Sequence, residues 1–536
     1  MSDAPSSNPA HGAASPDPSK PAAAPVGQTV GRGLAWVLLS FSASKLVGVA
    51  LTVALGYLLK PEEMGTWAAT LGVFGFMQSC RDAGVATLLV QRGEREYANL
   101  IGPAFWLSTS FHVFAALLVV VIGLTMLLHI PGKEEIGRTL MYCSAALVAM
   151  APGTIAQARL KMKLSFRTIS SITAISALVR AVVVLTGAML GAGAISFALG
   201  LLCLGLFESI AMSIATKEKL WAHPAQPSRW PSLIWTVRWS LAITFSLSLL
   251  AVGDWAALSL TASAGVIGIY YFGVQLMMQA EQAIAGTAAQ VLFPTFSSLQ
   301  NDQTRLASAF HRVLRALSLL SSPATLALGL LADPLIRFVW PSGRWDESIL
   351  CLTALTLFAS FRICFVAPFT LLQGQGKFRG AFAAMATAGG TLFLSALVGG
   401  LLFDDPLRIA ICTGGLLGPV CLLVTMIVAK QIGLARRKAF TGIVRPWLVA
   451  ATLAIAIFLL DRWAMPEVSA RMGWTTIPRE AHLARLVISG SLFALLYAIA
   501  ARIVLAEVLQ DALSIAPARI RPLAERVLRL QASATP

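Results

Sequence analysis

Long apolar runs, separated by short polar stretches, fill this chain from about residue 33 onward. Each run is near or above the roughly 20 residues that a helix needs to cross a bilayer. No run alternates apolar and polar positions as a half-buried strand would, and an isolated segment satisfies its backbone groups in lipid only as a helix. The pattern predicts an all-α integral membrane protein with about fourteen transmembrane helices, over 33–59, 64–90, 100–128, 138–158, 168–190, 193–216, 236–260, 265–294, 314–340, 348–372, 379–402, 407–429, 443–463 and 483–505.

Composition agrees with a membrane protein, because only 12% of the 536 residues are charged and 57% are hydrophobic, whereas a soluble chain is about a quarter charged. Residues 1–30 differ from the rest. They are rich in Ala, Pro and Ser and have no apolar core of a signal peptide, so we expect a disordered cytoplasmic tail. The seven cysteines lie in apolar segments without metal-ligand spacing. We therefore expect buried thiols and no metal site.

The basic residues are distributed unevenly between alternate loops. With the N-terminus inside, about 27 of the 41 Lys and Arg residues lie on the cytoplasmic side, about 10 on the outer side and four within spans. This bias predicts a multi-pass membrane protein with both termini cytoplasmic. It also explains most of the net charge of +16 without nucleic acid. The C-terminal stretch 506–536 is amphipathic and basic, and we expect it on the cytoplasmic lipid surface.

Signatures of an enzyme are absent from the sequence. No Gly-rich phosphate loop follows a strand, and neither H-E-x-x-H nor C-x-x-C occurs. The outer loops are short, and the longest, 461–485, offers no domain for an active site. We expect a transporter, not an enzyme, with no cofactor and with coupling to a proton or sodium gradient as an open option.

Two short segments read alike, and both follow the pattern A-P-x-T-x-x-Q. APGTIAQARLK begins at Ala151 and ends at Lys161, and APFTLLQGQGK begins at Ala367 and ends at Lys377. They end spans four and ten, so six spans separate them and both would point the same way through the membrane.

A second pair of stretches matches in the same order. GTWAATLGVFGFMQ opens span two and GIYYFGVQLMMQ opens span eight, which places Gly65 on Gly268 and Trp67 on Tyr270. Two matches six spans apart indicate parallel repeats, which are typical of transporters with a substrate site at the repeat interface. The predicted organisation is two six-helix bundles in parallel repeat plus two extra helices: 1–30 tail, 31–217 N-terminal lobe, 232–430 C-terminal lobe, 443–505 helices thirteen and fourteen, and 506–536 amphipathic tail.

Three stretches, YLLKPEEMGTWAA, RDAGVATLLVQRGE and QARLKMKLSFRTIS, resemble the Wzx-type polysaccharide flippases. This group belongs to the multidrug/oligosaccharidyl-lipid/polysaccharide (MOP) exporter superfamily. The resemblance is diffuse, and it covers roughly residues 32–430. It implies a fourteen-helix, two-lobed, V-shaped exporter that moves undecaprenyl-diphosphate-linked oligosaccharide across the bacterial inner (cytoplasmic) membrane to the outer leaflet, for lipopolysaccharide or exopolysaccharide assembly. Its partners would be that lipid-linked oligosaccharide, membrane lipid and other polysaccharide-assembly proteins.

Four cations fall inside the predicted spans, where a charge is expensive and usually faces a cavity or a partner. A lipid diphosphate needs such cations, because Arg binds several oxygens in a forked geometry and Lys acts as a point charge. The candidate diphosphate contacts are Lys45, Arg81, Arg180 and Arg362. A structural role stays open for two of them, since Arg81 precedes Asp82 and Arg180 could pair with Glu208.

Buried carboxylates and amides supply the other candidates. Intramembrane carboxylates can carry a coupling ion or serve as counter-ions, and the candidates are Asp254, Glu281 and Glu208. A glycan path needs amides and aromatic rings, and its candidates are Gln275, Gln279, Gln282, Trp36 and Tyr271. Hydrogen bonds between helices are the alternative role for the amides. For Trp67 and Tyr270 we favour an interfacial aromatic belt.

Two other functions compete with the flippase. A drug antiporter of the same superfamily would transport cations and would need a net-negative cavity. A membrane polysaccharide polymerase or glycosyltransferase would need a sizeable outer loop with catalytic side chains. The predicted cavity cations disfavour the first, and the short outer loops disfavour the second.

Overall fold

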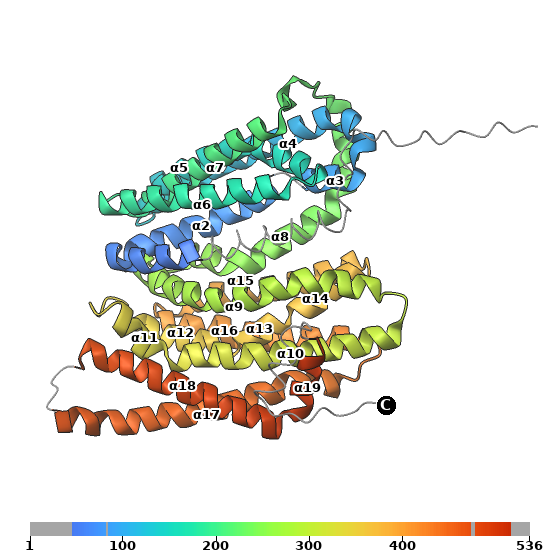
Figure 1. The fold of residues 1–536 in the computed structure, drawn as a ribbon. Coiled ribbons are helices and arrows are strands. Elements are labelled where there is room, and N and C mark those ends of the chain that lie inside the picture. The colour runs from blue at the N-terminus through green and yellow to red at the C-terminus, as the bar shows by residue number, and fades with distance from the viewer. Residues whose placement is uncertain (1–45, 82–83, 473–476, 516–536) are drawn as a thin grey trace, which may run out of the picture.

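The computed structural model describes residues 46–81, 84–472 and 477–515, and this part of the chain forms helices and short connections (Figure 1). A helix over Leu46–Leu58 comes first. The elements that follow are α2 (Pro61–Cys80), α3 (Val85–Arg92), α4 (Glu94–His129), α5 (Glu134–Met162), α6 (Phe166–Met189), α7 (Ile195–Thr216), the 3-10 turns η1 (Leu220–Ala222) and η2 (Pro227–Arg229), α8 (Trp230–Thr261), α9 (Ala264–Ser298), α10 (Gln303–Leu330), α11 (Ala332–Val339), α12 (Glu347–Leu357), α13 (Ala359–Cys364), α14 (Val366–Gly374), α15 (Phe378–Leu402), α16 (Pro406–Gln431), α17 (Arg436–Met472), α18 (Arg479–Val504) and α19 (Ala506–Ile515).

The prediction of an all-α membrane protein is confirmed, but the expected count of fourteen spans is not. Within the described residues, ten helices are long and apolar enough to cross a bilayer, or eleven if the bent segment from Glu347 to Gly374 counts as one. Two further helices, α2 and α9, have 20 and 35 residues but do not reach that hydropathy. Both helices contain glycine, threonine, glutamine and acidic residues, and these residues lower the mean hydropathy of the two helices.

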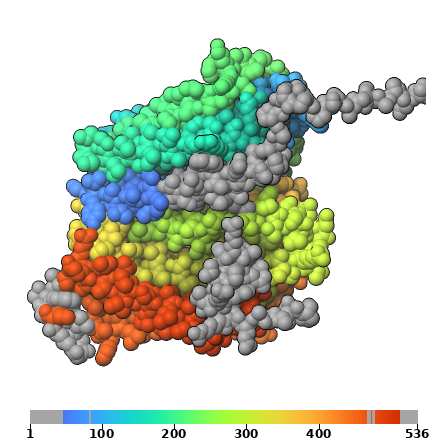
Figure 2. Space-filling view, in the orientation of Figure 1, coloured from blue at the N-terminus to red at the C-terminus, as the bar shows by residue number. Residues whose placement is uncertain are grey.

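The helices run side by side in successive layers (Figure 1). Helices α3 to α7 form one side of the molecule, α8, α9 and α15 lie in the middle, α10 to α14 and α16 come next, and α17 and α18 form the opposite side. Helix α2 packs against both α8 and α9, so it joins the first half of the chain to the second. The space-filling view shows the same order, with the early residues on one side and the late residues on the other (Figure 2).

Hydrogen bonds between connections show which of them share an end of the molecule. At one end, Lys133 Nζ donates to Ala262 O over 2.7 Å, and Arg344 Nη1 donates to Leu59 O over 2.9 Å. We call this the clasp end; it holds the connections at 59–60, 130–133, 262–263, 340–346 and 403–405. The connections at 163–165, 217–229, 299–302, 375–377 and 432–435 begin one helix later and therefore lie at the other end. We call it the basic end, because Lys and Arg residues lie in these connections or on the adjoining helix ends.

The clasp end is closed by two tryptophans that precede α12. Trp340 Nε1 donates to Val53 O over 3.1 Å, and Trp345 Nε1 donates to Gly56 O over 2.8 Å. Phe272 of α9 stacks on Trp345 with ring centroids 4.1 Å apart. A Cβ at Gly56 would lie 2.3 Å from Trp340 Nε1, so the close approach requires glycine. We refer to Trp340 and Trp345 bound to the Leu46–Leu58 helix as the tryptophan clasp.

The described side chains of helix α19 lie on protein, whereas the expectation that 506–536 forms an amphipathic tail on the cytoplasmic lipid surface stays a prediction, since most of that stretch lies outside the described residues. Val508 and Leu509 are buried in a cluster with α10, α17 and α18. Arg315 of α10 pairs with Glu507 at 3.2 Å and with Asp511 at 2.6 Å. Val508 and Leu509 of α19 therefore pack against helices, and two of its carboxylates pair with α10. The predicted tail 1–30 and residues 516–536 lie outside the described part of the chain.

Candidate functional site

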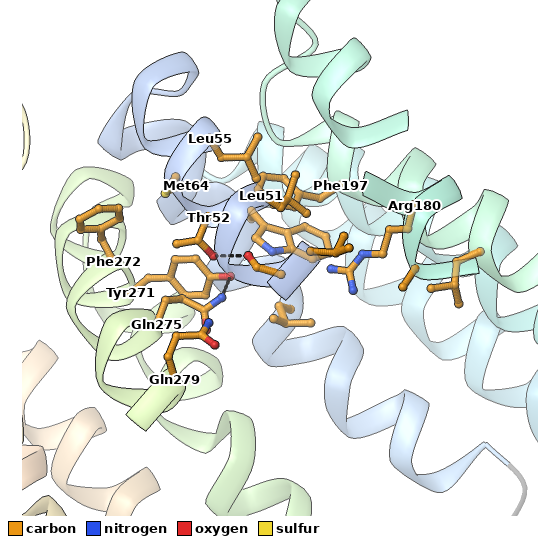
Figure 3. A pocket seen from close by; sticks show the side chains of 16 residues that line it. Leu51, Thr52, Leu55, Met64, Arg180, Phe197, Tyr271, Phe272, Gln275 and Gln279 are labelled. Atoms are coloured by element: carbon orange, nitrogen blue, oxygen red, sulfur yellow. Dashed lines mark hydrogen bonds between the residues drawn. The ribbon is translucent and has the colours of Figure 1, made fainter. Parts of the chain in front are cut away.

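A central cavity of about 260 Å³ lies where the first and second halves of the chain meet (Figure 3). Its walls come from the Leu46–Leu58 helix, α2, α6, α7 and α9. Polar side chains sit on opposite walls, with Arg180 of α6 on one side and Tyr271, Gln275 and Gln279 of α9 on the other. Because residues nearly a hundred positions apart converge here, the cavity is a candidate binding site at the interface of two halves.

Arg180 points its guanidinium into this cavity (Figure 3). It forms no ion pair within the described part of the chain, and its Nε is shielded from solvent without a hydrogen-bond partner. The alternative pairing with Glu208 is not found, since Glu208 instead accepts a hydrogen bond from Ser176 Oγ over 2.7 Å. A shielded guanidinium without a counter-charge is costly, so the site is suited to an anionic ligand.

The α9 wall supplies neutral hydrogen-bonding groups. Gln275 Nε2 donates to Tyr271 Oη over 2.8 Å, and Gln279 lines the cavity one turn further along. Gln282 is half-buried and lies beyond the residues that line this cavity. Of the five glycan-path candidates, the structure therefore brings three together. Trp36 lies outside the described residues, as does the diphosphate candidate Lys45.

Two more cavities continue from the central one toward the basic end. One of about 160 Å³ shares Leu204 with the central cavity and is lined by Arg81 and Glu208. The next, of about 720 Å³, shares Arg81 with it and reaches Lys161 near the end of α5. The shared lining residues place the three cavities in a row, which we call the cation row after Lys161, Arg81 and Arg180.

The first copy of the A-P-x-T-x-x-Q pattern lines this row. Thr154, Gln157 and Lys161 of α5 all face the 720 Å³ cavity, because positions i, i+3 and i+7 share one face of a helix. Sequence reasoning noticed this repeat but gave Lys161 no role. The signal that could have identified Lys161 is the spacing of three and then four residues between the polar positions Thr154, Gln157 and Lys161 at the end of an apolar span. Arg81 contacts the same helix, with its Nη1 3.0 Å from Met150 Sδ.

The structure places Arg362 away from the cation row. Its Nε lies 3.1 Å from Glu281 Oε1, and its Nη2 donates to Leu250 O over 3.4 Å. The adjoining cavity measures about 20 Å³, enough for about one water molecule. Two residues for which the sequence suggested separate roles, head-group contact and ion coupling, thus form an ion pair with each other.

Asp254 lies at the same small cavity and is fully enclosed by protein. Tyr270 Oη donates to Asp254 Oδ2 over 2.9 Å and lies 3.2 Å from Thr413 Oγ1. The backbone N–H of Trp255 donates to Asp254 Oδ1 over 2.9 Å. The carboxyl is therefore held by neutral donors, with no ion pair to it among the described residues, so it could exchange a proton or bind a cation.

The predicted aromatic belt is wrong for two residues. Trp67 and Tyr270 are each 1% exposed. The Trp67 ring stacks on Phe197 with centroids 4.7 Å apart, at the edge of the central cavity. Helices α2 and α9 lie between other helices, so the side chains of Trp67 and Tyr270 contact protein and not the lipid interface. Among the described residues, no group of three or more His, Cys, Asp or Glu side chains could hold a metal ion.

Comparisons with known proteins agree with this geometry. A family model described as "Polysaccharide biosynthesis protein" matches residues 54–350. An uncharacterized membrane protein in the cps region of Klebsiella pneumoniae is 21% identical over 349 residues, which cover 64% of this chain and 70% of that protein. The succinoglycan biosynthesis transport protein ExoT of Rhizobium meliloti (strain 1021) is 23% identical over 331 residues, 59% of this chain and 64% of that protein.

Two solved structures share the fold. The lipid II flippase MurJ, in an inward closed conformation, superposes with a TM-score of 0.68 at 15% identity, covering 88% of this chain and 99% of that chain. An inward-facing multidrug resistance MATE family transporter of the MOP superfamily superposes with a TM-score of 0.52 at 13% identity, covering 74% of this chain and 98% of that chain. At these identities the likeness establishes the fold.

Proposed function

This chain belongs to the polysaccharide biosynthesis protein family, and on that basis we propose that it carries undecaprenyl-diphosphate-linked oligosaccharide from the cytoplasmic to the outer leaflet of the bacterial inner membrane. The expectation of a membrane transporter of the Wzx type within the MOP superfamily is confirmed, as is the expectation of a transporter in place of an enzyme. We propose the identity of the cargo, the coupling to an ion gradient and the direction of transport. The proposal includes other polysaccharide-assembly proteins as partners that supply and receive the cargo.

The cation row carries this proposal. Three cations, Lys161, Arg81 and Arg180, line the three adjoining cavities, and Glu208 is the one carboxylate among the lining residues that the structure describes. A diphosphate has several anionic oxygens that a guanidinium can bind in pairs. In a site of low dielectric such contacts are much stronger than in water. A cationic drug would meet repulsion in the same row, which disfavours the antiporter.

The row supports stepwise passage of the head group. Lys161 lies near the basic end, Arg81 borders both outer cavities, and Arg180 borders the central one. A diphosphate entering at the basic end would meet Lys161 first and Arg180 last. Lys45 and Arg362 stay proposed contacts of the same cargo, although Arg362 would first have to separate from Glu281, 3.1 Å away.

The amide wall of α9 suits the glycan. Tyr271, Gln275 and Gln279 offer donors and acceptors in the cavity that also contains Arg180. Sugar hydroxyls need both kinds of partner, and an amide side chain supplies both. With the diphosphate at Arg180, the first sugars would lie against α9 while the polyprenyl chain stays in lipid. Gln282 and Trp36 are proposed to extend this path.

Asp254, Glu281 and Glu208 are the proposed coupling groups, with Asp254 the strongest candidate. Its carboxyl accepts from Tyr270 Oη and from the Trp255 N–H, both over 2.9 Å. Glu281 is engaged by Arg362 and Glu208 by Ser176. Uptake of a proton or a sodium ion at Asp254 would change the hydrogen bonding of Tyr270 on α9. That helix also carries the amide wall, so the change could reach the cargo site.

The proposed architecture is two lobes of six spans, 31–217 and 232–430, plus helices thirteen and fourteen over 443–505. Counting the Leu46–Leu58 helix, α2, α9 and the bent segment α12–α14 with the ten apolar helices gives fourteen. Closure at the tryptophan clasp and a row of cavities toward the basic end support an inward-facing state. Alternating access would open the clasp and close the row. The basic end is proposed to be cytoplasmic, together with both termini.

The experiment that tests this proposal is reconstitution into vesicles with a lipid-linked oligosaccharide in one leaflet. We expect the natural chain to expose the glycan on the other leaflet, and Arg180→Ala to abolish this while Arg180→Lys retains part of it. Arg408→Ala is the matched control, because Arg408 is exposed at the clasp end. Unchanged exposure with Arg180→Ala would overturn the assignment, and drug export without glycan exposure would favour an antiporter.

A further inference from the structure

The second copy of the repeated A-P-x-T-x-x-Q pattern also ends at a cavity. Lys377, the equivalent of Lys161, lies in the connection between α14 and α15 and lines a cavity of about 500 Å³. The other lining residues include Arg379 at the start of α15, Trp239 of α8 and Gln431 at the end of α16. The cavity lies at the basic end, but it shares no lining residue with the cation row. The proposed transport route therefore gives it no role.

The charges in this cavity are all positive. Lys377 and Arg379 line it, and no Asp or Glu does. Neither residue forms an ion pair with a carboxylate in the part of the chain that the structure describes. The Arg379 guanidinium lies 5.5 Å from the centroid of the Trp239 ring, so an aromatic face holds it in place while its charge stays unneutralised. Both residues are exposed to solvent, and two cations that line one cavity suit a phosphate oxygen.

Aromatic rings lie in and beside the same cavity. Trp239 packs edge-on against Phe382 with centroids 6.3 Å apart, and Phe378 is 51% exposed. Trp235, one turn before Trp239 on α8, is 69% exposed. Of the helices that line the cavity, α8, α15 and α16 have the length and hydropathy of membrane spans, and α14 belongs to the bent segment. The cavity thus lies where the apolar part of these helices gives way to the polar connections, at the depth of lipid head groups.

From this combination we propose that Lys377 and Arg379 bind the phosphate of an anionic glycerophospholipid, whose acyl chains lie along Trp239 and Phe378. Gln431 contributes an amide that can donate to the same phosphate or to the head-group hydroxyls. The site needs only a membrane-embedded chain, so it does not depend on the proposed cargo. The two copies of the repeat then end in cavities of like charge and different use, one in the transport route and one for a resident lipid.

Native mass spectrometry of the full-length protein in detergent tests this site with dioleoylphosphatidylglycerol as the probe and dioleoylphosphatidylcholine as the neutral comparison. We expect phosphatidylglycerol to bind more tightly, and K377Q/R379Q to weaken its binding roughly thirty-fold, since each basic residue near an anionic lipid contributes about a factor of five. The matched control is R436Q/R437Q, which removes two exposed cations of the same end that do not line the cavity. It should change phosphatidylglycerol binding far less.

A second variant separates the cavity from its charge. Gly380 lines the cavity, and its nearest neighbour for a Cβ is the end of the Leu372 side chain at 3.4 Å, so Gly380→Leu fills the space without altering charge. Weaker phosphatidylglycerol binding in this variant supports the site. Equal losses of phosphatidylglycerol affinity in K377Q/R379Q and R436Q/R437Q, or unchanged phosphatidylglycerol binding in Gly380→Leu, would overturn the proposed lipid site. Displacement of the lipid by millimolar inorganic phosphate, or preference for undecaprenyl diphosphate over phosphatidylglycerol, would also overturn it, because the site would then bind a free anion or the cargo.

Discussion

Gly65 of α2 and Gly268 of α9 face each other where the two helices cross, and neither position has room for a side chain. A Cβ at Gly65 would lie 1.7 Å from Ala264 O, and a Cβ at Gly268 would lie 1.7 Å from Pro61 O. The contact is reciprocal, because each glycine meets the residue about one turn before the other. The sequence comparison within the chain aligns these same two glycines. Equivalent positions of the proposed repeat thus contact each other at the clasp end.

This crossing predicts the effect of adding one methyl group. Gly65→Ala should push α2 and α9 apart, since the obstructing atom is a backbone carbonyl that cannot rotate away, and overpacking of this kind costs about 1–3 kcal/mol. We expect a lower midpoint of thermal unfolding and a more open clasp end. Gly415→Ala is the control, because a Cβ at Gly415 meets nothing within 4 Å and alanine is favoured in a helix. Equal unfolding midpoints for the two variants would contradict the close approach.

The tryptophan clasp makes a separate prediction about opening. Trp345→Phe leaves an aromatic ring to pack on Phe272 but removes the donor to Gly56 O, leaving a buried carbonyl unpaired at a cost of about 1–3 kcal/mol. We expect a thiol-specific, membrane-impermeant reagent to label a cysteine placed at Thr52 in the central cavity faster from the clasp side. Trp463→Phe is the control, since Trp463 is 73% exposed. Labelling that is no faster than in the control would mean that the clasp does not limit opening.

Hydropathy predicted most helices to within a few residues but could not show what each one faces. The predicted span 379–402 is α15, Phe378–Leu402, and 193–216 is α7, Ile195–Thr216. Helices α2 and α9 carry mixed faces, because they line the cavity between the two halves. Their polar residues lower the hydropathy that a span test measures. On α9, the same kind of polar residue, Gln275 and Gln279, lines the central cavity.

The partners of the intramembrane charges could not be read from the sequence. Arg180 and Arg362 look alike as single arginines inside apolar runs, yet one faces the central cavity and the other pairs with Glu281, 81 positions earlier. Only the packing of α6, α9 and α13 decides between these outcomes. Lys161 was passed over because it lies at a span end, where lysine is common. Its place on the polar face of α5 became informative only with the cavity beside it.

The basic end contains a carboxylate whose contribution to stability should depend on pH. Burial of Glu218 would by itself raise its pKa, but hydrogen bonds from Tyr97, Lys163 and Arg159 outweigh burial and hold the pKa below the usual 4.5. A carboxyl with a lowered pKa stabilises the folded state above its unfolded-state pKa and loses that contribution as the pH falls through the lowered value.

Glu218→Gln should therefore destabilise the protein by about 1 kcal/mol at pH 7, and the difference from the natural chain should shrink as the pH falls below about 4.5. Thermal unfolding in detergent at the two pH values measures this. Glu96→Gln is the control, since Glu96 pairs with Arg92 at an exposed site and contributes little. If the loss of stability caused by Glu218→Gln stays constant down to pH 3, the ionised carboxylate is not its cause.

Asp254 tests the coupling proposal. Asp254→Asn keeps the shape and the contact with Tyr270 but removes the exchangeable charge, so transport should lose its dependence on an imposed proton or sodium gradient. The measurement is glycan exposure in vesicles with and without each gradient. Glu480→Gln, an exposed change at the start of α18, should keep the dependence of the natural chain. Full gradient dependence in Asp254→Asn would move the coupling site elsewhere.

The central claim is that Arg180 binds the diphosphate of the cargo, and the most direct measurement is the affinity of the purified full-length protein for undecaprenyl diphosphate and undecaprenyl monophosphate. A guanidinium hydrogen bond to phosphate contributes about 1.5–3 kcal/mol, so Arg180→Gln should weaken diphosphate binding roughly ten- to hundred-fold and reduce the preference over monophosphate. Arg408→Gln should leave both affinities unchanged. Equal diphosphate affinities for the natural chain and Arg180→Gln would contradict the account.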